Sequence, residues 1–510
     1  MKLQEKNLFT ALSVLTGLFT AFSFPKMNLF FLMWAALVPL FYVICSSSVK
    51  QSFFYAFLAG LTAYMLGVFF VLDSIFLLTD SYITALFFYI VLCLYFSLYW
   101  GVWGALVSFI KQLNAKPLVF VFISASLWVL LEYTRTYVLT GWPWLLTGYS
   151  QYLFTHIIQI AEFTGVYGVS FVIVLVNALL YYGASGSKKI YFAAALSIFA
   201  SVFLFGAYRY NLFADFGEKE YTAAAVQSNI EQYKKLDNSY REETFSKLEE
   251  SAEQLSEIGA DLNVWAESEI INFIPLDLEA YIFADKLAKT AGGFNIIGAP
   301  YLDGDGKLFG AVFHFDGKGG YVSVHKKNHL IPFGEYLPIP KSVAGFIGIY
   351  DKNDYSVKGD DAAVFTDGEL YTGTLICSEN LFPDIVRQFV LNGAKVLTSN
   401  SNDAWFFDSS GPYKHFSANV FRAVESRKAV IAAANTGVSA IIDAAGKITV
   451  STRVYERAVI SGTFRQNGYL TFYMRFGDVF TAGCMVCILL FAAAFLFRKL
   501  YVKNRIRTKI

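Results

Sequence analysis

Long apolar runs separated by short polar breaks fill the first two hundred residues of the chain and return near its C-terminus. A helix needs roughly 20 apolar residues to cross the hydrocarbon of a bilayer. The pattern therefore predicts a polytopic α-helical membrane domain with about eight spans, at about 8–24, 27–46, 51–74, 82–110, 117–134, 164–184, 189–208 and 475–497. The first run does not predict a cleaved signal peptide, because its end, Ala21-Phe-Ser-Phe24, lacks a small-residue cleavage site and more apolar runs follow at once.

The charges between these runs predict the orientation of the chain in the membrane. With the N-terminus inside, Asp73 and Asp80 fall in an outside turn, and basic residues fall in the inside segments. Cytoplasmic loops carry an excess of Lys and Arg, so we expect both termini to be cytoplasmic. The basic residues concerned are Lys50, Lys111, Lys116, Lys188, Lys189, Arg498, Lys499, Lys503, Arg505, Arg507 and Lys509.

Between about 213 and 468 the pattern changes to short apolar runs that alternate with helical stretches and with Gly, Asn and Asp turns. Such alternation predicts a layered α/β domain. We expect residues 1–212 to form a membrane domain of seven spans, 213–468 an extracytoplasmic catalytic domain, and 469–510 a C-terminal transmembrane helix with a basic tail. The predicted strands include Ala223–Gln227, Leu262–Trp265, Asn295–Gly298, Ala311–Phe315, Gly320–Val324, Tyr371–Ile376 and Val430–Ala434.

Composition agrees with a membrane protein and excludes one class of partner. Of the 510 residues, 55% are hydrophobic, 18% are aromatic and only 16% are charged, which is more apolar side chain than a soluble protein of this size needs. The net charge is +1, and no basic patch is interleaved with aromatic residues. Nucleic-acid binding is therefore not expected.

One of the five cysteines is a candidate nucleophile. Cys45, Cys93, Cys484 and Cys487 lie in predicted spans, whereas Cys377 ends the predicted strand Tyr371–Ile376 ahead of a helix that begins at Pro383. A thiol at a strand–turn–helix junction lies beside free backbone N–H groups, so we expect a lowered pKa and a place for an oxyanion. A buried structural cysteine is the alternative. An unpaired thiol outside the membrane favours the nucleophile.

Two charged residues follow other predicted strands and could serve this thiol. Glu267 follows Leu262–Trp265, and Lys327 follows the strand that begins at Gly320. Because α/β sheets place their sites at strand ends, we expect both residues to lie near Cys377. The domain also offers histidines as bases or metal ligands. His325 and His329 lack the Glu of a zinc-protease motif, so no metal site is expected; the other two are His314 and His415.

The segment Gly141–Tyr149 is too apolar for a solvated loop and too broken by Gly and Pro for a helix. It contains Trp142 and Trp144. Two interpretations remain open: an aromatic belt at the membrane interface, or a lining for a lipid chain on its way to the outer domain.

Several motifs in order resemble one family. The Glu–Lys–Cys set resembles the site of the nitrilase, or carbon–nitrogen hydrolase, superfamily, and the whole chain resembles the apolipoprotein N-acyltransferase family. The departures from the family pattern are Ala266, Ser378, Phe407 and, less directly, Leu236. The motifs that carry the resemblance are Trp265-Ala-Glu267, Lys327-Asn-His-Leu-Ile-Pro-Phe-Gly-Glu335, Ile376-Cys-Ser-Glu379, Asn402-Asp-Ala-Trp-Phe406, Val226-Gln-Ser-Asn-Ile230 and Asn435-Thr-Gly437.

The resemblance implies an αββα sandwich and a ping-pong acyl transfer. Glu267 would be the general base and acid, Lys327 would stabilise the oxyanion and keep the thiol partly as thiolate, and Cys377 would carry the acyl group as a thioester. The donor would be a phospholipid, and the acceptor the N-terminal amine of a diacylglyceryl-modified apolipoprotein at the bacterial inner membrane. No cofactor would be needed. Supporting residues would be Glu335, Ser378 and Glu379, and substrate-binding residues Trp142, Trp144, Trp405 and Asn402.

Two other functions would account for part of the sequence pattern. A membrane-tethered amidase that uses water as acceptor would employ the same three residues, but it would not need so large a lipid-facing part. A transporter or scaffold would not explain Glu267, Lys327 and Cys377 together at strand ends.

Overall fold

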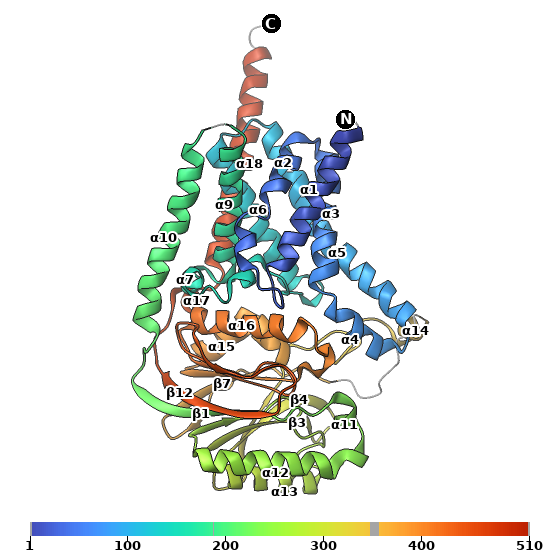
Figure 1. Cartoon of the computed structure of the whole chain (residues 1–510), viewed down its shortest axis with the longest axis vertical. Coiled ribbons are helices and arrows are strands. Elements are labelled where there is room, and N and C mark those ends of the chain that lie inside the picture. Colours follow the sequence, from blue (N-terminus) through green and yellow to red (C-terminus); the bar gives the residue numbers. More distant parts are fainter. Residues whose placement is uncertain (1–2, 187, 347–355, 508–510) are drawn as a thin grey trace.

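The computed structural model describes residues 3–186, 188–346 and 356–507, and its helical part and its sheets lie at opposite ends of the molecule (Figure 1). The first described helix, α1 (Leu3–Phe22), begins at the end farthest from the sheets, and the last, α18 (Val479–Arg507), finishes there (Figure 1). The other main helices of the helical part are α2 (Val38–Ser46), α3 (Val49–Gly67), α4 (Phe70–Thr79), α5 (Tyr82–Gln112), α6 (Pro117–Tyr137), α9 (Val166–Ala184) and α10 (Ile190–Phe213).

Five helices among the described residues are long and apolar enough to cross a membrane, or six if the bent pair α3 and α4 is one span. The predicted count of eight is therefore not confirmed. The second predicted span divides into a short 3-10 helix, Phe30–Trp34, and α2. The third predicted span, at about 51–74, bends by 69° between α3 and α4. Leu145 packs into this bend, where a side chain at Gly67 would come within 2.5 Å of it.

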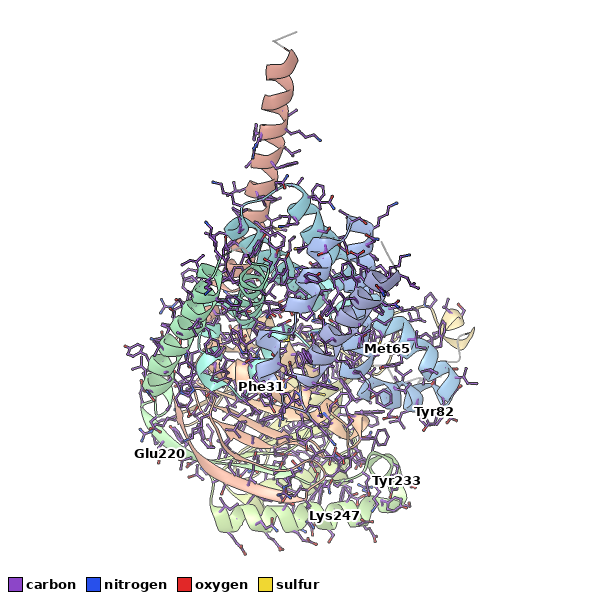
Figure 2. The ribbon with its side chains drawn as sticks, turned by 45° about the horizontal axis from the view of Figure 1, so that its top comes forward. Phe31, Met65, Tyr82, Glu220, Tyr233 and Lys247 are labelled. Atoms are coloured by element: carbon purple, nitrogen blue, oxygen red, sulfur yellow. The ribbon has the colours of Figure 1, made fainter. Side chains whose placement is uncertain are left out.

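The two ends of the molecule differ in the side chains that they expose (Figure 2). Phe31, Met65 and Tyr82 lie on the helical end and are 59%, 41% and 64% exposed. Glu220 and Lys247 lie on the other end, within an exposed strand start and a charged helix (Figure 2). Exposed aromatic and aliphatic side chains on long helices are typical of a surface that faces lipid.

The apolar segment Gly141–Tyr149 forms a loop that packs against α6, where two buried charged residues bind its backbone. Glu132 accepts hydrogen bonds from the Trp128 indole at 3.0 Å and from the Thr147 backbone at 2.6 Å. Arg135 donates to the carbonyls of Trp144 at 2.9 Å and Leu145 at 3.3 Å. These hydrogen bonds fix the loop against α6.

Among the described residues, twelve strands form two six-stranded sheets. The first has the order β12-β1-β2-β3-β4-β5, and the second has the order β11-β10-β9-β8-β7-β6. In the second sheet β7, β8 and β9 run parallel, so their carboxyl ends meet at one edge. The first sheet contains β1 (Lys219–Gln227), β2 (Leu262–Val264), β3 (Phe294–Leu302), β4 (Leu308–Phe315), β5 (Tyr321–Lys326) and β12 (Ala458–Gln466). The second contains β6 (Phe365–Asp367), β7 (Leu370–Ile376), β8 (Val396–Ser401), β9 (Val430–Ala434), β10 (Ala440–Ile442) and β11 (Ile448–Ser451).

The sheets pack face to face and each is covered by a pair of helices, an αββα arrangement. Helices α12 (Arg241–Ile258) and α13 (Leu278–Ala291) cover the first sheet on the side away from the membrane helices (Figure 1). Helices α15 (Pro383–Leu391) and α16 (Gly411–Ser426) lie between the second sheet and the membrane helices (Figure 1). Side chains of α15 and α16 belong to the same apolar core as those of the membrane helices. The second sheet is therefore joined to the membrane part through these two helices.

Buried ion pairs reinforce this junction. The carboxylate of Glu162, in the short helix α8 (Ala161–Thr164), accepts from Arg427 at the end of α16 at 2.5 Å and from Arg209 of α10 at 2.5 Å. Arg427 and Glu162 are fully buried. Breaking such a pair on one side leaves a buried charge without its partner, so this contact holds the two-sheet domain in one position against the helices.

Candidate active site

Cys377 lies directly after β7, at the first residue of a 3-10 helix, Cys377–Leu381, that precedes α15. Its φ is +51°, in the left-handed region that non-glycine residues rarely adopt. Such backbone conformations cluster at functional sites. The side chain is 7% exposed. The predicted strand, turn and helix are confirmed, and the turn is a tight helical one that faces the other sheet.

Glu267 and Lys327 meet as the sequence predicted. Glu267 follows β2 and Lys327 follows β5, and the Lys327 Nζ donates to Glu267 Oε1 at 3.0 Å and to Glu335 Oε1 at 2.7 Å. The Lys327 side chain is 1% exposed. Burial alone would lower the pKa of Lys327, but the charges of Glu267 and Glu335, with a further contribution from Cys377, raise it well above its usual value. The ammonium therefore stays charged at neutral pH, as an oxyanion stabiliser must.

The predicted lowering of the Cys377 pKa is wrong. Burial raises the pKa of this thiol well above its usual value, and the negative charge of Glu267 raises it further. Lys327 acts in the opposite direction but is outweighed, because Asp403 and Glu335 add to the rise. A buried site with three carboxylates favours the neutral thiol. The thiol is therefore protonated at rest, and a nucleophilic role would require its proton to leave.

Glu379 ties the Lys327 segment to the Cys377 segment. Its Oε1 accepts the backbone N–H of Asn328 at 2.5 Å, and its Oε2 accepts that of Ile376 at 2.7 Å. The carboxylate is fully buried, and His325 lies 3.7 Å from it. Burial alone would lower the pKa of His325, but Asp361 and Glu379 raise it to about 9. Glu379 therefore fixes Lys327 and Cys377 relative to each other.

Glu379→Ala is expected to lower the free energy of unfolding by about 2–6 kcal/mol, since it leaves two buried N–H groups without acceptors at about 1–3 kcal/mol each. Denaturant unfolding of the full chain in detergent measures the loss. Glu369→Ala is the matched control, because Glu369 is 73% exposed and pairs with the exposed Lys219. Equal losses in the two variants would contradict the assignment.

Ser378 supplies a backbone donor beside the thiol. It is the second residue of the 3-10 helix, so its N–H belongs to the first turn, where backbone donors have no partner within the helix. Its hydroxyl is buried and has no hydrogen-bond partner in the described part of the chain. The arrangement therefore offers a backbone N–H beside Cys377, and the Lys327 ammonium is close enough to lower the pKa of the thiol.

Asn402 is placed to orient Glu267. It follows β8, the parallel neighbour of β7, and its backbone N–H donates to Glu267 Oε2 at 3.1 Å. Its amide donates to Gln232 at 2.9 Å and accepts from Asn435 at 3.0 Å. The Asn402 side chain thus hydrogen-bonds to Gln232 and Asn435. Its expected contact with substrate stays a prediction.

The three predicted tryptophans lie on the membrane side of the site. Trp144 packs edge-on against Phe406 at 5.5 Å between ring centroids and stacks with His415 at 5.7 Å. Trp142 lies 6.0 Å from Trp144. Trp405 is half-buried, and its carbonyl accepts from Ser74 of α4. The Gly141–Tyr149 loop thus reaches the segment that follows β8.

Two residues near the thiol were not assigned a role from sequence. Asp403 Oδ1 and His415 Nδ1 are 2.7 Å apart, and both side chains are 3% exposed. The sequence showed His415 as one of several histidines, and Asp403 as part of a motif, without a sign that they pair. Of the departures from the family pattern, Ala266 is buried and Phe407 is 42% exposed, while the side chain of Leu236 lies outside the described residues.

The sequence matches known proteins over nearly the whole chain. Residues 16–179 match the model of the apolipoprotein N-acyltransferase N-terminal domain, and residues 222–469 match that of carbon-nitrogen hydrolases. The apolipoprotein N-acyltransferase of Geobacter metallireducens is 34% identical over 96% of this chain and 95% of its own length. The apolipoprotein N-acyltransferase of Photobacterium profundum is 28% identical over 92% of this chain and 91% of its own length. Among solved structures, an amidase from Nesterenkonia sp. has a TM-score of 0.39 and 17% identity, covering 52% of this chain and 97% of that one.

Proposed function

Because the chain belongs to the apolipoprotein N-acyltransferase family, and is thus an acyltransferase, we propose that it moves an acyl chain from a phospholipid to the N-terminal amine of a diacylglyceryl-modified apolipoprotein through a thioester on Cys377. The observation that carries this proposal is the buried Lys327 ammonium, 3.0 Å from Glu267 and close enough to Cys377 to lower its pKa. These groups supply a base, an oxyanion partner and a nucleophile in one place.

In the first half of the reaction Cys377 attacks the ester carbonyl of the phospholipid. The thiol proton passes to Glu267 as the sulfur–carbon bond forms. The negative charge on the carbonyl oxygen is stabilised by Lys327 and by the Ser378 N–H. The ester carbon–oxygen bond then breaks, and Glu267 gives its proton to the departing alkoxide. Lysophospholipid leaves, and the acyl chain stays on sulfur.

In the second half the amine of the apolipoprotein attacks the thioester. Glu267 takes a proton from the attacking nitrogen, the same donors stabilise the second oxyanion, and the carbon–sulfur bond breaks. The sulfur regains a proton from Glu267, and an amide is released. The cycle needs no redox step and uses the residues of this chain at every proton transfer.

Membrane placement follows from the substrates in this proposal. Both carry lipid, so the site must lie at the bilayer surface. We propose about eight spans, with residues 213–468 on the periplasmic side of the bacterial inner membrane and both termini in the cytoplasm. The loop with Trp142 and Trp144, together with Trp405, would receive the acyl chain, since these residues join the helices to the site.

Intact-mass spectrometry of the full chain in detergent tests the function. Phospholipid alone should add one acyl mass to Cys377, and a diacylglyceryl-cysteine peptide with a free amine should remove it as amide. The same peptide with its amine acetylated is the matched control and should leave the acyl mass in place. Rapid release of free fatty acid without any amine would instead favour an amidase-like hydrolase, and an unmodified Cys377 would refute the thioester.

A further inference from the structure

Lys235 binds the residue next to Glu267 and has no part in the mechanism above. It lies in the short helix α11 (Gln232–Leu236), is 1% exposed, and its Nζ donates to the backbone carbonyl of Ser268 at 2.9 Å. Ser268 directly follows Glu267 in the chain. Burying an ammonium costs free energy unless it is paired or hydrogen-bonded. The hydrogen bond that this ammonium makes within the described chain goes to the turn that carries Glu267.

The turn that Lys235 binds has a backbone conformation that needs support. Ser268 has a φ of +50°, in the left-handed region that non-glycine residues rarely adopt. Such a residue persists only where its surroundings hold it. Strand β3 gives part of this support, because a Cβ at Gly298 would come within 2.8 Å of the Glu267 Cα, and the Gly298 carbonyl accepts the Ile270 N–H at 3.1 Å. The Lys235 ammonium adds a contact at the carbonyl of the strained residue itself.

Helix α11 also reaches the Glu267 carboxylate, through Asn402. The Gln232 side chain accepts from the Asn402 amide at 2.9 Å, and the Asn402 backbone N–H donates to Glu267 Oε2 at 3.1 Å. Gln232 and Lys235 are three residues apart, so they lie on the same face of the helix. Tyr233, between them in sequence, is 58% exposed (Figure 2). One face of α11 therefore contacts both the backbone turn after Glu267 and a partner of its carboxylate.

A buried acid beside this contact explains why the donor is a lysine. The peptide that Lys235 binds joins Ser268 to Glu269. The Glu269 side chain is fully buried, and neither of its carboxylate oxygens has a hydrogen-bond partner among the described residues. A buried carboxylate needs an opposite charge near it. The ammonium on the adjoining peptide carries that charge.

We infer that Lys235 is a positioning residue for Glu267: its ammonium holds the Ser268 carbonyl and thereby sets the place of the carboxylate that takes the thiol proton. The inference rests on the proposed function, because it requires Glu267 to accept that proton. A general base must lie within hydrogen-bond reach of the proton that it removes. A displacement of about 1 Å can slow a reaction about a hundredfold.

Two rates measured on the full chain in detergent test the inference. The first is acyl-enzyme formation from phospholipid, which we expect Lys235→Met to slow about tenfold to a hundredfold. The second is alkylation of Cys377 by iodoacetamide, read by peptide mass spectrometry. Alkylation should not slow, because it proceeds from thiolate in equilibrium with solvent and needs no general base.

Lys234→Met is the matched control for the loss of a cation from α11. Lys234 pairs with Glu231 and Glu243, which are both exposed. Exposed pairs contribute little to stability, so acylation should stay within about twofold of wild type. An equal loss in the Lys234 and Lys235 variants would contradict the assignment.

A double-mutant cycle separates positioning from a general loss of structure. In the Glu267→Gln background, Lys235→Met should slow acylation less than about threefold, because the base that it positions is gone. A lysine that only stabilised the fold would slow acylation by the same factor in both backgrounds. That result overturns the inference, and so does acylation within about threefold of wild type in Lys235→Met alone.

A second variant covers the case in which Lys235→Met does not fold. Lys235→Met/Glu269→Gln removes both buried charges together, so no buried carboxylate is left without its cation. It should acylate about tenfold or more slowly than Glu269→Gln alone, because the Ser268 carbonyl has lost its donor. Equal rates in these two proteins overturn the inference. The wild-type protein separates the two proposals, because a wild type that forms no acyl-enzyme refutes the proposed function itself.

Discussion

Glu267→Gln is expected to slow acyl-enzyme formation about a thousandfold, within the 10²–10⁴ range of general acid–base catalysis, while Cys377 becomes easier to ionise. The negative charge of Glu267 raises the pKa of the thiol, and Lys327 lowers it. Removing the negative charge of Glu267 while keeping the positive charge of Lys327 therefore lowers the pKa of the thiol. The pH midpoint for alkylation of Cys377 should therefore shift to lower pH, although the departing alkoxide has lost its proton donor.

Rates of acylation and of alkylation across a pH series measure both effects. Glu335→Gln is the informative comparison, because Glu335 also raises the pKa of the thiol but more weakly. It should shift the midpoint in the same direction by less and slow acylation less than Glu267→Gln does. Acylation within tenfold of wild type in Glu267→Gln would remove Glu267 from the chemistry. A midpoint that moves to higher pH would contradict the charges assigned to the site.

The convergence of Glu267, Lys327 and Cys377 was predictable because each follows a strand with an apolar pattern. The structure confirms β2, β5 and β7 at those positions. Strands of a sheet end at shared edges, so residues far apart in sequence meet there. The helix expected at Pro383 is also confirmed, as α15. Local pattern and topology together were sufficient to locate the three candidate residues.

The protonation state of Cys377 was not predictable, because it depends on which groups surround the sulfur in space. A strand–turn–helix junction alone lowers a thiol pKa. Here burial and three carboxylates from separate segments outweigh that effect. The pairing of Asp403 with His415 was not predictable for the same reason, since it requires α16 to lie across the segment that follows β8. No periodicity in the sequence reports such a contact.

The bend within the third predicted span, 51–74, was not predictable from hydropathy for a related reason. An apolar run of sufficient length predicts a spanning helix only if it stays straight. The run at 51–74 instead bends between α3 and α4, where Leu145 occupies the space beside Gly67. The loop that supplies Leu145 is held by Arg135 on another helix. The bend is thus a tertiary feature, and it brings Ser74 to the segment that contains Trp405.

Lys327→Met is expected to reduce acyl transfer by at least about a thousandfold, since loss of one oxyanion donor alone lowers the rate about 10²–10³-fold. The substitution should also shift the pKa of the Cys377 thiol in the direction opposite to the shift in Glu267→Gln. Lys327 lowers the pKa of the thiol. Without it the alkylation midpoint should move to higher pH. The substitution also leaves the mostly buried Glu267 and Glu335 side chains, 13% and 21% exposed, with no cation between them. Breaking a buried pair on one side costs about 3–5 kcal/mol, so the midpoint of thermal unfolding should fall as well.

Lys327→Arg separates the catalytic loss from the loss of stability. Its guanidinium keeps the positive charge near both carboxylates, so most of the stability should return. A planar, larger group does not reproduce the point charge of the ammonium, so acyl transfer should stay well below wild type. Equal acylation rates in the Met and wild-type proteins would exclude Lys327 as the oxyanion partner. Alkylation midpoints that move the same way in Lys327→Met and Glu267→Gln would show that burial, rather than the two opposed charges, controls the thiol.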